Sequence, residues 1–189
     1  MIFFLLSSKL SLAQILVGPV AGAQYSWVSF EDKDYKDLYK VKPVYGFNAG
    51  VGVSFLVRKR FFLHTSILYS TKGKVIEGRE DLRLRNKVTY HFIDVPIVYT
   101  VDFRGKLGSG KEFKYSFGIG PNIGYWLGGK GSISTTDLTE MTIDKQAYTI
   151  AFNKDQNEID QNEMSVADPT RVQLGLNLTA GIVFEPVPF

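Results

Sequence analysis

The feature that most constrains this chain of 189 residues is a regular alternation of apolar and small polar residues along most of its length. Between Tyr45 and Val57 the odd positions are aromatic or aliphatic, whereas the even positions are mainly glycine, asparagine and serine. A period of two residues predicts a β-strand. A soluble sandwich would carry solvated lysine, glutamate and threonine on its second face, so the small residues favour a narrow polar interior.

The same alternation predicts six strands, over 17–30, 45–57, 61–75, 88–103, 113–127 and 172–184. They are longer than the usual strand of about 5–6 residues. A strand that crosses a bilayer needs about 9–11 residues at a steep tilt. No convincing helix is expected, and no apolar run is long enough for a membrane helix. The sequence therefore predicts an all-β fold, an antiparallel up-and-down transmembrane β-barrel.

The connections between these strands alternate in length. Segments 58–60 and 104–112 are short, whereas 31–43, 76–87 and 128–170 are long and charged. In strand order, all long loops fall at one end, as in outer-membrane barrels with short periplasmic turns and long outer loops.

The charge is divided between regions of the chain. Segment 128–170 has three basic and eight acidic residues, although the whole chain has a net charge of +3. The basic residues are not gathered into a phosphate-binding face, so nucleic acid is not expected as a partner.

Aromatic residues on the apolar side of the strands fall near the two strand ends, with aliphatic residues between them. Such belts are typical of the two interfaces of a bilayer. If the first strand runs outward, the outer belt comprises Tyr25, Trp27, Tyr45, Phe47, Tyr69 and Tyr125. The inner belt comprises Phe55, Phe61, Tyr99, Phe103, Tyr115 and Phe184.

Four segments resemble strands of PorT-like outer-membrane β-barrel proteins of Gram-negative bacteria, and the similarity extends over most of 15–185. They are Ile67–Gly73, Tyr90–Tyr99 with its Asp-Val-Pro, Gly118–Tyr125 with its Gly-Pro, and Gly175–Gly181. The resemblance implies an eight-stranded antiparallel barrel. It also implies a role in cell-envelope biogenesis or protein secretion, with envelope or secretion proteins as partners.

The chain is expected to divide into a signal-peptide remnant at 1–13 and a barrel domain at 14–189 with a long outer loop at 128–170. Small residues at Ser11 and Ala13 fit a signal-peptidase site, and the lack of cysteine suits an envelope protein.

Six strands leave two open edges, which lipid cannot satisfy. Three explanations stay open. The last two strands are missing from this chain, or two strands lie within 128–170 (with 147–152 the best candidate), or a partner supplies the edges.

Polar residues on the second face are predicted to fill the interior of the barrel. They are His64, Ser66, Lys72, Asp94, Asp102, Lys114, Asn122 and Glu185. Buried charges need partners, and Asp102 is expected opposite or diagonal to Lys114. No cofactor or metal is predicted, because two histidines without a carboxylate at ligand spacing do not make a convincing site.

The two alternatives to a non-enzymatic outer-membrane barrel are an outer-membrane lipid-modifying enzyme and a soluble lipocalin-like ligand-binding barrel. The His64–Ser66 spacing resembles that of an outer-membrane lipid A deacylase, but such an enzyme needs these groups to face the bilayer and an acidic residue to orient the histidine. A soluble lipocalin-like barrel would place bulky aliphatic residues inside and charge outside. We therefore predict an outer-membrane location, contact with lipid, and no catalysis.

Overall fold

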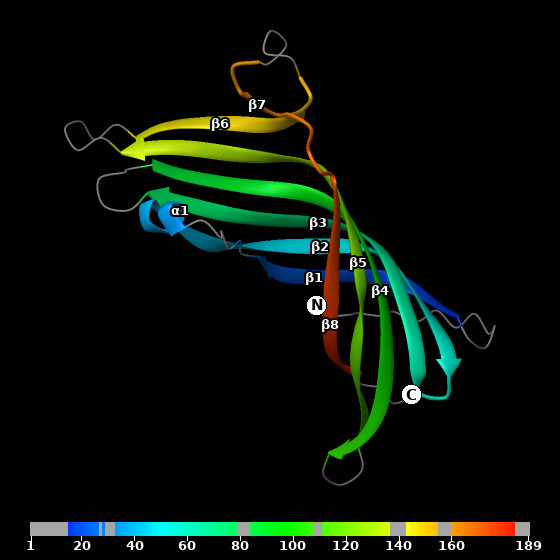
Figure 1. Cartoon of the computed structure of the whole chain (residues 1–189). Helices are drawn as coiled ribbons and strands as arrows, with labels where there is room; N and C mark the ends of the chain where they lie inside the picture. Colours follow the sequence, from blue (N-terminus) through cyan, green and yellow to red (C-terminus); the bar gives the residue numbers. More distant parts are fainter. Residues whose placement is uncertain are drawn as a thin grey trace.

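A computed structural model describes residues 15–26, 28, 33–78, 84–107, 111–136, 143–154 and 160–183 of the chain. Most of these residues form one eight-stranded sheet (Figure 1). Its strands are β1 (Ile15–Ser26), β2 (Tyr39–Arg58), β3 (Phe61–Gly78), β4 (Leu84–Leu107), β5 (Lys111–Thr136), β6 (Ile143–Phe152), β7 (Glu163–Val166) and β8 (Val172–Val183). The all-β, antiparallel up-and-down fold predicted from the alternation is confirmed.

The sheet follows chain order from β1 to β7, and β8 joins it through β5. Neighbouring strands are antiparallel, except that β7 is parallel to β6. The long strand β5 changes partner along its length. Residues 114–125 pair with β8, whereas residues 129–136 pair with β6.

Strands β1 to β5 and β8 are the six strands expected from the sequence. Among the described residues β1 pairs with β2 and β8 pairs with β5, so the curved sheet is not closed. Segment 128–170 does contain two strands, β6 and β7, and β6 covers the candidate 147–152. They extend the outer half of β5 instead of closing the sheet between β8 and β1.

The expected sorting of connections agrees with Figure 1, where α1 (Lys33–Leu38), β6 and β7 lie at the opposite end of the sheet from the β2–β3 turn. The expected loop bounds were wrong, because β2, β3, β4 and β5 continue into 31–43, 76–87 and 128–170, and β4 and β5 also continue into 104–112. Outside the bilayer a strand can carry charge on a solvated face, so loss of the apolar pattern does not end it.

The helix α1 was not expected either, because six residues are too few for a helical period to show in the sequence. No helix within the described residues combines the length and apolar character needed to cross a membrane.

The two faces of the sheet differ in the way that the alternation predicts. On β8, Leu174, Leu176 and Leu178 are 68–81% exposed. On the other face the small polar residues are buried, and Ser66, Ser70 and Thr100 are at most 6% exposed. This pattern is the inverse of a soluble protein, in which aliphatic residues are inside. The lipocalin-like alternative required the opposite arrangement and is therefore wrong.

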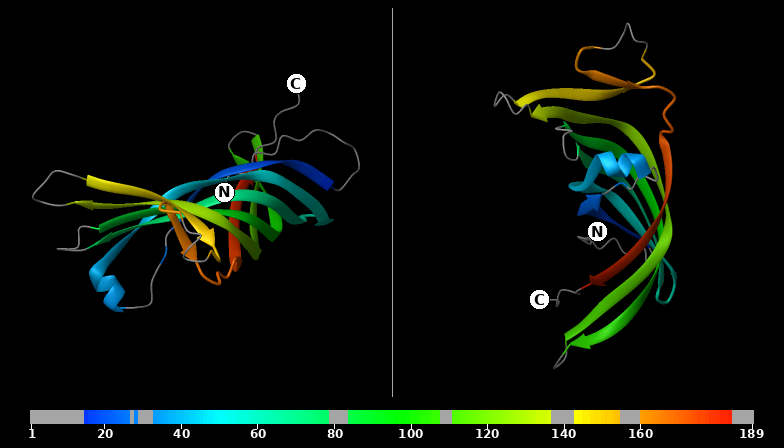
Figure 2. Two further views of the ribbon diagram at one scale, coloured as in Figure 1. Left: turned by 90° about the horizontal axis from the view of Figure 1, so that it is seen from above. Right: turned by 60° about the vertical axis from the view of Figure 1, so that its left-hand side comes forward.

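The sheet is strongly curved (Figure 2), and small residues on the inner face make room for this curvature. A Cβ atom added to Gly52 would lie 2.7 Å from the Val20 side chain, which is 1% exposed. At Gly50 and Gly120 a Cβ would collide with the carbonyl oxygens of Ile67 and Ile97. Glycine at these positions lets the neighbouring backbone approach closely.

We expect Leu178→Arg to lower the free energy of unfolding in lipid vesicles by about 2–4 kcal/mol, because the arginine would face hydrocarbon. Leu178 is 76% exposed, so the same change in a water-soluble protein would have almost no effect. Reversible urea unfolding of the chain in vesicles measures the difference. Gln173→Arg, on the same strand near its outer end, is the control and should change little. Equal stability of the two variants would contradict a lipid-facing β8.

Candidate functional site

The inner face contains an ion pair at the centre of a small polar cluster. The Lys72 ammonium lies 2.9 Å from Asp94 Oδ1, and Asn122 Nδ2 donates to the same oxygen at 3.1 Å. The side chain of Asp94 is 8% exposed and that of Lys72 is 31% exposed. Lys72 also lies over the ring of the buried Phe92, 4.5 Å from its centroid. Three predicted interior residues from β3, β4 and β5 thus form one cluster.

A second cluster surrounds His64 on β3. Ser54 Oγ lies 2.6 Å from His64 Nδ1, and Thr100 Oγ1 lies 2.8 Å from His64 Nε2. Each hydroxyl can donate or accept, so a neutral imidazole is hydrogen-bonded on both nitrogens in either tautomer. The ring of Phe62 stacks on the imidazole, with centroids 5.9 Å apart. The cluster therefore joins β2, β3 and β4 across the inner face.

The remaining predicted interior residues lie as follows. Ser66 is buried opposite Gly52 on β2. Asp102 pairs in register with Ser116, and Lys114 pairs with Arg104, so Lys114 is diagonal to Asp102 as the sequence indicated. Glu185 lies outside the described residues.

The predicted belt residues form cross-strand aromatic contacts in two rows. In the outer row the ring centroids of Tyr25 and Tyr45 are 5.0 Å apart, and those of Phe47 and Tyr69 are 6.0 Å apart. In the inner row the pairs are Phe61 with Tyr99 at 5.7 Å and Phe103 with Tyr115 at 5.2 Å. Phe55 pairs in register with Ile15 and Leu63, and Tyr125 pairs with Ile93. Trp27 and Phe184 lie outside the described residues.

The spacing of the rows suits a bilayer. Tyr115 and Tyr125 are ten residues apart on β5, which is about 33 Å along a strand and about 25 Å along the membrane normal at a tilt near 40°. The apolar band of an outer-membrane barrel has about this height. That the rings lie at the two lipid–water interfaces stays a prediction.

The outer row also contains His91, which sequence reasoning left out. Its Nδ1 lies 2.6 Å from the Tyr69 hydroxyl, and the two rings stack with centroids 5.8 Å apart. The signal in the sequence is weak, because His91 lies at an apolar position of the alternation and both of its chain neighbours, Tyr90 and Phe92, are aromatic.

Beyond the belts, the outer part of β5 carries β6 and β7. We call residues 143–154 and 160–166 the outer lobe. The buried Tyr148 of β6 reaches across β5 and donates its hydroxyl hydrogen to Asn86 Oδ1 on β4 at 2.8 Å. This bond fixes the lobe to the sheet.

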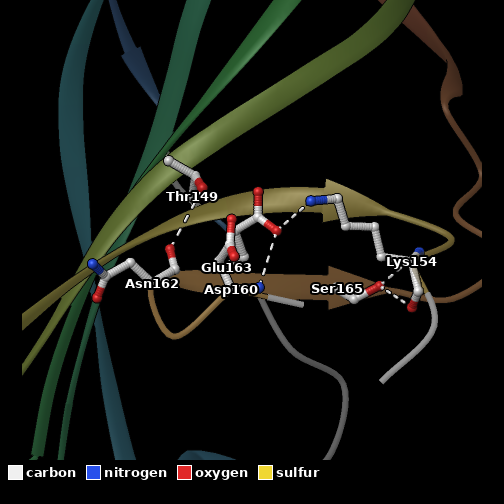
Figure 3. Close-up of polar contacts among 6 residues, drawn as sticks. All are labelled: Thr149, Lys154, Asp160, Asn162, Glu163 and Ser165. Atoms are coloured by element: carbon white, nitrogen blue, oxygen red, sulfur yellow. Dashed lines mark hydrogen bonds and ion pairs between the residues drawn. The ribbon is translucent and has the colours of Figure 1, made fainter. Parts of the chain in front are cut away.

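Polar contacts within the lobe connect β6, the described residues 153–154 and 160–162, and β7 (Figure 3). Lys154 forms an ion pair with Glu163, whose carboxylate also accepts a hydrogen bond from the backbone N–H of Asp160 at 3.4 Å. Ser165 accepts a hydrogen bond from the Lys154 N–H and donates one to the Lys154 carbonyl. The lobe therefore has a defined shape outside the predicted lipid band.

Arg171 stabilises the point at which β5 changes partner from β8 to β6. Its guanidinium carbon lies 4.6 Å from the ring centroids of both Tyr125 and Phe152. Its Nε donates to the Trp126 carbonyl at 2.9 Å, and the Trp126 N–H donates back to the Arg171 carbonyl. Planar guanidinium groups suit such stacked positions. This junction was not predicted from the sequence.

A comparison with protein families gives a match to the outer membrane protein beta-barrel domain over residues 8–188. No curated protein and no solved structure gives a significant match to the chain. The family match spans nearly the whole chain and agrees with the long strands, the exposed aliphatic face and the sorted connections.

We expect Lys72→Met to lower the free energy of unfolding by about 1–3 kcal/mol, because it leaves the buried Asp94 carboxylate without its cation. The double variant Lys72→Met/Asp94→Leu should recover part of this loss, since it removes the remaining charge as well. A double-mutant cycle in vesicles measures the coupling. Strictly additive effects of the two changes would show that the pair does not matter to stability.

The outer lobe should lose order in acid. The hydrogen bond from Lys154 holds the pKa of Glu163 below its ordinary value of 4.5. The ion pair therefore stabilises the lobe above about pH 4.5, and this contribution is lost as the pH falls through the lowered pKa. Amide hydrogen exchange in β7, corrected for intrinsic rates, should rise over that interval. Glu163→Gln should abolish the pH dependence, and an unchanged profile in this variant would contradict the assignment.

Proposed function

The chain belongs to the outer membrane protein β-barrel domain family and is an integral outer-membrane protein, and from this premise we propose a structural or interaction role in envelope biogenesis or protein secretion. The PorT-like resemblance of segments such as Tyr90–Tyr99 and Gly118–Tyr125 supports the finer part of the proposal. Partners would be other envelope or secretion proteins, in addition to the surrounding lipid.

The observation that carries this proposal is the outer lobe. Strands β4 and β5, with 24 and 26 residues, are far longer than a bilayer requires. Their outer ends support β6 and β7, and the lobe is fixed internally by the Lys154–Glu163 pair and to the sheet by Tyr148. A lobe that is supported by long strands and fixed by these contacts is better explained as a contact surface than as a simple connection between strands.

The inner face favours contact over catalysis as well. His64 is engaged by Ser54 and Thr100 on the face that is turned away from lipid. A lipid-modifying enzyme would need its nucleophile and base on the exposed face, where β8 presents leucines. We therefore propose that the chain works without enzymatic activity and that these polar clusters stabilise the barrel.

A complementation experiment tests the role. A strain that lacks the chain should retain surface proteins in the periplasm, and the full chain should restore their export. Replacing residues 143–166 with a short glycine–serine linker should abolish restoration while heat-modifiable migration on a gel shows that the barrel still folds. Normal export without the chain, or full restoration by the linker variant, would contradict the proposal.

A site-specific photo-crosslinker shows which surface makes the contact. Met164 in the outer lobe is 40% exposed, and Leu176 on the predicted lipid-facing side is 68% exposed. We expect a crosslinked protein from position 164 and crosslinked lipid from the control position 176. Crosslinks to protein from position 176 alone would move the contact surface to the barrel wall.

A further inference from the structure

The exposed face of β4 changes character where the strand continues beyond the outer aromatic row. Alternate residues of a strand share a face, so Val95 and Ile93 at membrane level are followed outward by His91, Lys87 and Arg85 on the same side. The β4–β5 register shift between His91 and Phe92 inserts its extra residue on β5, so the alternation on β4 is uninterrupted. The face that meets lipid thus leads directly into a basic surface.

Neighbouring strands add cations to the same surface. One cross-strand row consists of Lys42, Val75, Lys87 and Ser132. The next row outward consists of Lys40, Glu77, Arg85, Ser134 and Lys145. Lys130 lies on this face opposite Thr89. We call the six exposed cations the basic strip, which comprises Lys40, Lys42, Arg85, Lys87, Lys130 and Lys145.

One acidic residue, Glu77, lies within these two rows. Lys42 forms an ion pair with it, and Arg85 Nε lies 3.5 Å from its carboxylate. The hydrogen bond from Lys42 and the positive charges of Arg85 and Lys40 hold the pKa of Glu77 below its ordinary value. Six cations around one carboxylate give the strip a clear excess of positive charge.

The strip begins just above the outer aromatic row. Lys130 pairs with Thr89, four residues outward from Ile93 in the aromatic row, which is about 13 Å along the strand, and the rows of Lys87 and Arg85 lie two and four residues farther out. Basic side chains next to a membrane surface attract anionic headgroups. We propose that the basic strip binds the phosphate-bearing headgroups of anionic lipids in the outer leaflet around the barrel.

Two observations favour lipid over a protein partner at this surface. The strip lies on the same face as the aliphatic wall, and its nearest cation, Lys130, lies opposite Thr89, four residues outward from Ile93. The lobe that would meet proteins lies within segment 128–170, which has eight acidic and three basic residues, and two of these three basic residues, Lys130 and Lys145, belong to the strip. Lipid binding at the strip does not depend on the proposed role in secretion.

A titration of the folded full chain in neutral detergent micelles tests the proposal, with phosphatidylglycerol and phosphatidylcholine as probes and native mass spectrometry as readout. The unmodified chain should retain phosphatidylglycerol preferentially, and the preference should weaken with salt. The variant Lys87→Gln/Lys130→Gln/Lys145→Gln should bind phosphatidylglycerol at least about tenfold more weakly. The charge-retaining variant Lys87→Arg/Lys130→Arg/Lys145→Arg should bind like the unmodified chain.

A matched pair of single substitutions distinguishes lipid binding at this surface from a general effect of the net charge of the chain. Lys74 on β3 pairs with Val88 and points to the inner face, at nearly the same height as Lys87. Lys87→Gln should weaken phosphatidylglycerol binding, whereas Lys74→Gln should leave it unchanged. Equal effects of the two variants, or equal binding of the two lipids by the unmodified chain, would overturn the proposal. Displacement by millimolar inorganic phosphate would also overturn it, since that result identifies a site for free phosphate.

Discussion

The central constraint on this structure is that the backbone N–H and C=O groups of a sheet in lipid must form hydrogen bonds with one another. Lipid offers no hydrogen bonds, so each strand at membrane level depends on its neighbours. Strands β2 to β5 satisfy this requirement through continuous antiparallel pairing over most of their length. Among the described residues, β1 and β8 are each paired with a neighbouring strand on one side. In a bilayer, the backbone groups on the second side of each strand need further hydrogen-bond partners.

This constraint explains the chemistry of the two faces. Curvature crowds the side chains on the inner face, and Gly52 beneath Val20 shows how little space is left there. Small residues therefore alternate with a few polar groups that bond to one another, as Lys72, Asp94 and Asn122 do. The outer face has no such restriction on volume. It can carry leucines that would be a liability in water but contribute to stability in lipid.

The fold followed from the sequence because the alternation is a local signal that survives in every strand at membrane level. The polar contacts were harder to predict, since they depend on register between strands. Ser54 and Thr100 meet His64 from ten residues before it and 36 residues after it, and only the pairing of β2, β3 and β4 reveals that. Arg171 could not be predicted for a related reason, because its role exists only where β5 leaves β8 for β6.

The extent of the outer strands could not be predicted from the alternation, because the charged residues in these stretches resemble those of loops. Around Glu77 and Arg85 the apolar pattern disappears, yet the strands continue with cations on one face and buried residues such as Val88 on the other. The charged residues therefore indicate where the strands leave the hydrocarbon of the bilayer, and they do not indicate where the strands end. A chain with this arrangement has three levels along its strands: an aliphatic wall, a basic surface above it, and the outer lobe, which belongs to the segment 128–170 with its excess of acidic residues. Each level matches the charge and polarity expected on passing outward from lipid tails to anionic headgroups and then to water.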